Sequence, residues 1–89
     1  MTEAVMWEAK AAQGRGADLL AWAREQALPA LAAAAGRVEL FSAPGERVLL
    51  ISWWPQGVAR LAPPQPPAGL LARPVHHWAF RSELVVEAG

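Results

Sequence analysis

The only two histidines of the chain, His76 and His77, are adjacent and are followed by Trp78. An imidazole can transfer a proton, ligate a metal or an external haem, or donate a hydrogen bond to a ligand. Adjacent residues of a regular strand point to opposite faces, so these two rings cannot easily reach one metal ion. We therefore expect no metal site. Each histidine is a candidate catalytic residue on its own, and the alternative is a surface pair that bonds to backbone or water.

Aromatic and charged side chains indicate where a ligand would be held. Three tryptophans of the predicted strands, Trp7, Trp54 and Trp78, are candidates to line a cavity for a flat apolar molecule. The alternative is that these rings pack in the core and in a subunit interface, because each one buries a large apolar area. Arg81 could hold an anionic group of the ligand, and an ion pair with Glu83 is the simpler expectation for it.

The residue types that are missing exclude several kinds of chemistry. The chain has no Cys, Tyr or Asn, so thiol catalysis, thiolate metal sites, a Tyr acid and an Asn oxyanion donor are all excluded. Asp18 is the only aspartate, so a paired-Asp site is excluded as well. Glu8 is a candidate base if it faces a pocket, and it has no special chemistry if it faces solvent. No Gly-rich phosphate loop or nucleophile elbow occurs.

Length and composition predict one small domain, residues 1–89, that associates with itself. A chain of 89 residues is near the lower size limit for folding alone, and without cysteine it has no disulfide to help. Idealised packing or oligomerisation must then supply the stability. Apolar residues make up 54% of the chain, which is high for a small monomer with a polar surface. We interpret this excess as a buried interface in a homodimer.

The charge balance argues against two classes of partner. Lys and Arg together number 8, as do Asp and Glu, and the charges are scattered without a run of one sign. A binder of nucleic acid or of an anionic membrane surface needs a basic patch, so neither partner is expected. No apolar stretch approaches the ~20 residues of a membrane span, and the N-terminus lacks the layout of a signal peptide. We expect a cytoplasmic protein.

The first half of the chain predicts a strand and a helix. The strand spans residues 4–11, and the hydrophobic pattern of residues 17–36 is that of an amphipathic helix. Asp18 lies in the first turn of this helix, where the helix dipole favours an anion. Pro29 lacks the N–H that a helix interior needs, so a kink or break is expected there. Trp22 lies off the apolar arc, and we expect something other than the core of this chain to cover it.

A hairpin follows the helix. Its strands span residues 37–42 and 47–54, and the turn between them contains Pro44–Gly45. Both faces of the second strand are apolar, so both should be covered, and the helix can cover only one. Trp53 and Trp54 face opposite sides of a regular strand. One of these two rings is therefore expected to meet a partner subunit.

The last third of the chain is rich in proline. Residues 55–74 hold six of the eight prolines, so this segment cannot be a regular helix over its whole length. Proline-rich loops favour an extended backbone, and one short turn is expected at residues 68–73. The segment 62–74 is either a lid over a pocket or a rigid strap that replaces a lost helix. A final strand is predicted over residues 75–88.

This order of elements predicts an α+β ferredoxin-like fold, β-α-β-β-(short or lost α)-β, with a four-stranded antiparallel sheet. One helix covers one face of such a sheet and leaves the other face bare. Pairing two sheets about a two-fold axis would cover the bare faces and form a dimeric α/β barrel.

The layout, with MWEAKA at residues 6–11 and HHWAF at residues 76–80, resembles the dimeric α/β-barrel superfamily. It is most similar to the small bacterial proteins grouped with the antibiotic biosynthesis monooxygenases. A proline near the end of the first helix and the central hairpin are further points of resemblance. The resemblance implies cofactor-independent oxygenation of aromatic polyketides, or haem degradation, as activities. Both typically use an Asn together with Trp, Tyr or His in a pocket between sheet and helices, and here another residue type would have to replace the Asn.

Two classes of function stay open. The first is a protein that binds an apolar aromatic molecule in a cavity lined by Trp and His, and that as an enzyme would oxidise or isomerise it without a cofactor. The second is a catalytically inert dimer that serves as an accessory or structural subunit. An enclosed cavity with converging polar groups would favour the first class. A core filled by the chain's own Trp rings would favour the second.

Overall fold

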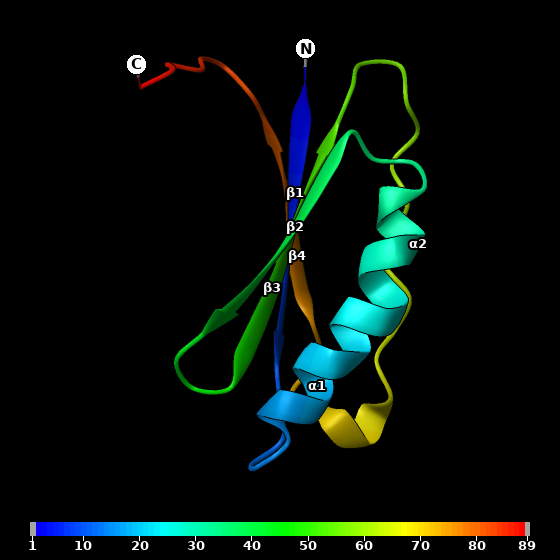
Figure 1. Ribbon diagram of the computed structural model, residues 1–89, viewed down its shortest axis with the longest axis vertical. Helices are drawn as coiled ribbons and strands as arrows, with labels where there is room; N and C mark the ends of the chain where they lie inside the picture. Colours follow the sequence, from blue (N-terminus) through cyan, green and yellow to red (C-terminus); the bar gives the residue numbers. More distant parts are fainter. Residues whose placement is uncertain (1, 89) are drawn as a thin grey trace.

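A computed structural model describes residues 2–88 of the chain. It has the α+β architecture that the sequence predicts, with one helix packed on a four-stranded antiparallel sheet (Figure 1). No helix among these residues is long and apolar enough to cross a membrane. The strands are β1 (Glu3–Lys10), β2 (Arg37–Ala43), β3 (Arg47–Trp54) and β4 (His76–Arg81).

The strands lie in the order β2-β3-β1-β4, and each neighbouring pair is antiparallel. This order is compatible with a ferredoxin-like fold. Residues directly opposite each other on paired strands share a face, so the register decides which side chains meet. Met6 of β1, for example, lies between Ile51 of β3 and Trp78 of β4. The two edge strands are β2 and β4.

The predicted helix is a continuous run of three segments, namely α1 (Gly16–Trp22), η1 (Ala23–Ala27) and α2 (Leu28–Ala32). The middle segment is π-helical, because the N–H of Leu28 donates to the carbonyl of Ala23, five residues back. This wider turn comes directly before Pro29, which has no N–H to donate to the preceding turn, so the regular α-helical pattern of hydrogen bonds is interrupted there. The disruption expected at Pro29 therefore takes the form of a π segment within a continuous helix.

The hairpin turn caps the start of α1. The carboxylate of Glu46 accepts hydrogen bonds from the backbone N–H groups of Gly14, at 3.0 Å, and Gly16, at 3.1 Å. A negative charge is favourable at this end of a helix. Asp18 lies in the first turn, as predicted, and forms an ion pair with Arg15 at 2.6 Å. The contact of Glu46 joins the β2–β3 hairpin to the helix.

The core lies between the helix and one face of the sheet. Trp7 and Trp54 are 3% and 1% exposed. The indole N–H of Trp54 donates a hydrogen bond to Ser52 Oγ at 2.8 Å. The one polar group of this indole ring therefore has a partner inside the apolar core. The prediction that something outside the core covers Trp22 is wrong, because this ring stacks on Trp7 with 6.2 Å between centroids. The other buried apolar residues are Ala9, Ala11, Leu19, Ala23, Ala27, Leu31, Val48, Leu50 and Leu70.

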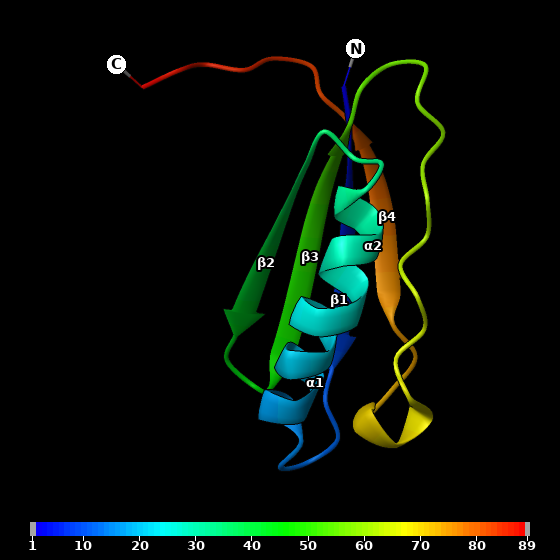
Figure 2. The same ribbon diagram turned by 45° about the vertical axis from the view of Figure 1, so that its right-hand side comes forward.

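The connection from β3 to β4 begins with an extended segment, residues 55–67. It overlaps the first part of the segment 62–74 discussed above, and from here on the name strap refers to residues 55–67. Figure 2 shows the strap running beside β4 to the short 3-10 helix η2 (Ala68–Leu70), which is the short turn that the sequence predicts. Beyond η2 the chain returns to the sheet, where Leu71 forms an isolated bridge with Ala11. Helix and strap lie on the same side of the sheet (Figures 1 and 2).

The last strand is shorter than predicted. The sequence predicts a strand to residue 88, whereas β4 ends at Arg81. Arg81 is paired with Glu3, the first residue of β1, and the N–H of Ser82 donates to the carbonyl of Thr2 at 2.9 Å. Because β1 begins at Glu3, there are no further residues of β1 with which β4 could form backbone hydrogen bonds. The apolar residues 84–86 consequently stay 70–82% exposed.

The sheet face that points away from the helix, here called the open face, carries apolar side chains on all four strands, with charged residues toward its ends. No element of residues 2–88 crosses it (Figure 1). On its edge strand, Trp78 and Phe80 are 45% and 50% exposed. The apolar side chains of the open face are Ala4, Met6, Phe41, Ala43, Leu49, Ile51, Trp53, Trp78 and Phe80.

Candidate functional site

The two candidate histidines lie on opposite faces of β4, as expected for a regular strand. His76 is paired with Glu8 on the open face, and its ring meets Trp78 edge-on at 5.8 Å between centroids. His77 is paired with Trp7 and lies on the helix side of the sheet. Both histidines also line a hollow of about 420 Å³ at the outer edge of β4. No three His, Asp or Glu side chains among residues 2–88 are grouped so that they could hold a metal ion.

The structure places two of the three candidate ligand-binding tryptophans in the core. Trp7 and Trp54 fill the space between sheet and helix, and neither lines any of three surface hollows. Trp78 lies on the open face and lines the edge hollow. Trp53 faces away from Trp54, as predicted, and the guanidinium of Arg37 lies 4.8 Å from the centre of its ring. The interior of the chain is thus filled by its own aromatic rings.

Glu8 is the centre of a charge cluster at one end of the open face. Its side chain is 12% exposed, and its carboxylate accepts hydrogen bonds from Arg73 at 2.6 Å and Arg47 at 3.4 Å. The Nε–H of Arg73 is buried and has no hydrogen-bond partner within residues 2–88. Glu8 therefore ties β1 to β3 and to the segment before β4. The sequence does not indicate this pairing, because Arg73 is 65 residues away in the chain.

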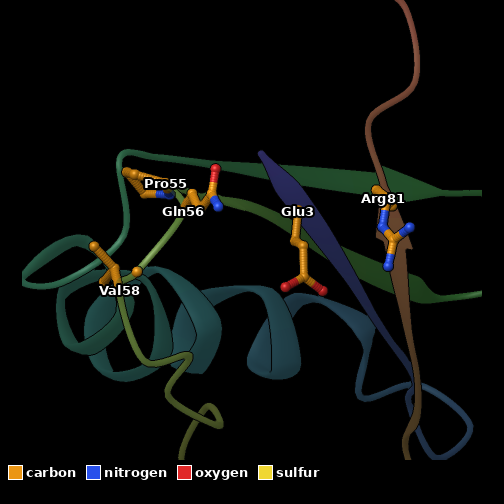
Figure 3. Close-up of a pocket in the computed structure, with 6 residues that line it drawn as sticks. Glu3, Pro55, Gln56, Val58 and Arg81 are labelled. Carbon is orange, nitrogen blue, oxygen red and sulfur yellow. The ribbon is translucent and has the colours of Figure 1, made fainter. Parts of the chain in front are cut away.

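Arg81, the candidate residue for binding an anionic group of a ligand, lines a hollow of about 410 Å³ at one end of the sheet. Figure 3 shows Arg81 and its cross-strand neighbour Glu3 on one side of this hollow, with strap residues opposite. The expected ion pair with Glu83 is not formed, and Arg81 makes no ion pair within the described chain. The carboxylate of Glu3 lies 3.6 Å from Arg60 of the strap. Residues lining this hollow are Glu3, Pro55, Gln56, Gly57, Val58 and Arg81.

A larger hollow, of about 610 Å³, follows along the same two strands. Val5 of β1 and Ala79 of β4 form its apolar floor, and His77 lies at the next position of β4 on this face. Strap residues 60–62 form its wall, and they include Arg60. The sequence does not reveal this hollow, because it identifies a proline-rich strap without showing which strap residues stand over the sheet.

These surfaces are the basis on which a function can be argued. Comparison of the chain with models of protein families, with curated proteins and with solved structures finds no match. The function is therefore inferred from the open face, the filled core and the hollows beside the strap.

Proposed function

We propose that the chain functions as a homodimer in which two open faces pack together, as in the dimeric α/β-barrel proteins that it resembles. The observation that carries the proposal is the open face itself, which presents apolar side chains on four strands and has no helix or strand of residues 2–88 packed on it. Monomeric proteins rarely expose a large contiguous apolar surface. Two sheets that pack face to face at a distance of about 10 Å bury their inner side chains against each other.

The carboxylates of the open face allow a second copy of this chain as the partner. Arg37 lies 2.6 Å from Glu39, and Glu8 is bound by Arg47 and Arg73. A two-fold axis brings the same patch of both subunits together, so unpaired charges there would meet charges of their own sign. Because each of these acids already lies beside an arginine, no carboxylate of the described chain is left unpaired at this surface, and the surplus positive charge of Arg47, Arg73 and Lys10 lies at one end of it. The apolar side chains that lie between the Arg37–Glu39 pair and the Glu8 cluster can then pack against those of the second copy.

The filled core supports an accessory or binding role for this dimer over oxygenase chemistry. Trp7, Trp22 and Trp54 occupy the space between sheet and helix, which is where the resemblance would place a substrate pocket. The chain also has no Asn or Tyr to anchor a substrate there. The class of function that the geometry supports best is therefore the catalytically inert dimer.

A soluble gadolinium chelate, which broadens the NMR signals of exposed protons, tests the proposal. The indole ring of Trp78, 45% exposed in the single chain, should be protected from broadening in the dimer, and so should the methyl group of Met6. The methyl groups of Leu84 and Val86, 82% and 81% exposed, provide the internal control and should broaden strongly. Broadening of Trp78 as strong as that of Leu84 would contradict the proposed interface.

A further inference from the structure

The hollow of about 610 Å³ between the strap and strands β1 and β4, here called the strap groove, has the dimensions of a ligand site. Ligand pockets typically enclose roughly 300–1,000 Å³. The groove lies on the helix side of the sheet, opposite to the open face. An occupant of the groove would therefore not compete with the proposed dimer, and its binding does not require that dimer. The groove is lined by Val5, Arg60, Leu61, Ala62, His77 and Ala79.

The floor and one wall of the strap groove are apolar. Val5 and Ala79 are directly opposite each other on β1 and β4, and both point to the helix side. Leu61 of the strap is 51% exposed, so this side chain is not buried against the sheet beneath it. The strap stands over the floor without filling the space. Covering these side chains with the apolar body of a ligand would remove apolar surface from water, which is favourable.

Two hydrogen-bond donors, Arg60 and His77, also line the groove. Within residues 2–88, the one ion pair of Arg60 is with Glu3, at 3.6 Å, and the two side chains are 42% and 48% exposed. Exposed ion pairs of this kind contribute little, so a competing carboxylate can displace Glu3 from Arg60. None of the side-chain hydrogen bonds within residues 2–88 involves the imidazole of His77. Arg81 lines the neighbouring hollow, so two arginines face one glutamate in this region, and the local charge favours an anion.

We propose that the strap groove binds a small apolar monocarboxylate. The apolar body of the ligand lies on Val5 and Ala79 and against Leu61, and the carboxylate accepts hydrogen bonds from Arg60 and His77. Hydrogen bonds between charged partners are stronger than neutral ones, so they would fix the orientation of the ligand. Glu3 acts as an internal competitor that releases Arg60 when the ligand binds. The inference goes beyond the proposed dimer and assigns a ligand class to the opposite face of the sheet.

Calorimetric titration with naphthoate and with the uncharged naphthylmethanol tests this inference. Naphthoate should bind about tenfold more tightly than the alcohol, because only the acid can pair with Arg60. Arg60→Gln should remove most of this preference, with His77 as the remaining donor, and leave binding of the alcohol unchanged. Glu3→Gln should tighten binding of naphthoate by roughly threefold, since the competing carboxylate is gone. Arg37→Gln removes an ion-paired arginine from the open face and is the matched control, with no change expected.

Three results would overturn the inference. They are equal binding of both probes to the parent chain, no binding of naphthoate up to millimolar concentration, and equal losses in Arg60→Gln and Arg37→Gln. The same titration on a chain whose open face carries Ile51→Glu keeps this inference separate from the dimer. Naphthoate should bind that variant as it binds the parent, whether or not the parent is a dimer.

Discussion

Replacing Trp54 by alanine should lower the free energy of unfolding by about 3–5 kcal/mol, as removal of a large buried ring does in other cores. The side chain is 1% exposed, and its loss would leave a cavity between sheet and helix. It would also remove the donor that binds Ser52 Oγ at 2.8 Å, so a buried hydroxyl would lose its partner. Small domains are stable by only about 5–15 kcal/mol, so the variant should be close to unfolding at room temperature. Chemical denaturation followed by circular dichroism measures the loss.

Trp53→Ala is the matched control for this substitution. Trp53 is the adjacent ring on the same strand, but it lies on the open face and is only partly buried in the single chain. Its replacement should lower the free energy of unfolding by less than Trp54→Ala does at the same protein concentration. An equal or larger loss for Trp53→Ala would contradict the assignment of the core to the helix side of the sheet.

Placing a carboxylate in the middle of the open face should separate the subunits of the proposed dimer. Ile51 lies in the central row of this face, between Met6 and Glu39. Ile51→Glu would bury an unpaired charge, which costs several kcal/mol, and the two-fold axis introduces it twice. The dissociation constant of the dimer should rise by about 100-fold or more. Light scattering during size-exclusion chromatography over a dilution series measures this change.

Two controls make this result decisive. Ala21→Glu adds the same charge to the exposed side of α1 and should leave association unchanged. Circular dichroism should show that Ile51→Glu keeps the secondary structure of the parent, because the substitution is outside the core. Should that variant unfold, Leu49→Lys provides a second charge on the same face. A folded variant of either kind that associates as strongly as the parent would show that the open face is not the interface.

The sequence predicts those parts of the fold that depend on local patterns. Alternation in residues 47–54 correctly assigns Val48, Leu50 and Trp54 to one face of β3, because side chains of a strand alternate whatever surrounds it. Strand order and register are not local properties. The end of β4 at Arg81, in particular, is fixed by the point at which β1 begins, and no feature of the last 8 residues reveals it.

The candidate site is predictable only in part, for the same reason. The adjacency of His76 and His77 is enough to place them on opposite faces of a strand. The partners that define a surface come from distant segments, as with Glu8 and Arg73 or with Glu3 and Arg60. Trp22 illustrates the limit, because its position on a helical wheel does not show that it stacks on Trp7 across the core. Tertiary contacts decide these arrangements.

The measurement that tests the central claim most directly is the molar mass of the native chain in solution. Sedimentation equilibrium over a range of concentrations reports it without a label. One chain has a mass of 9.5 kDa, and packing of two open faces predicts twice that mass at micromolar concentration. The mass of a single chain at every concentration would contradict the account, because the apolar side chains of the open face would then remain in contact with water.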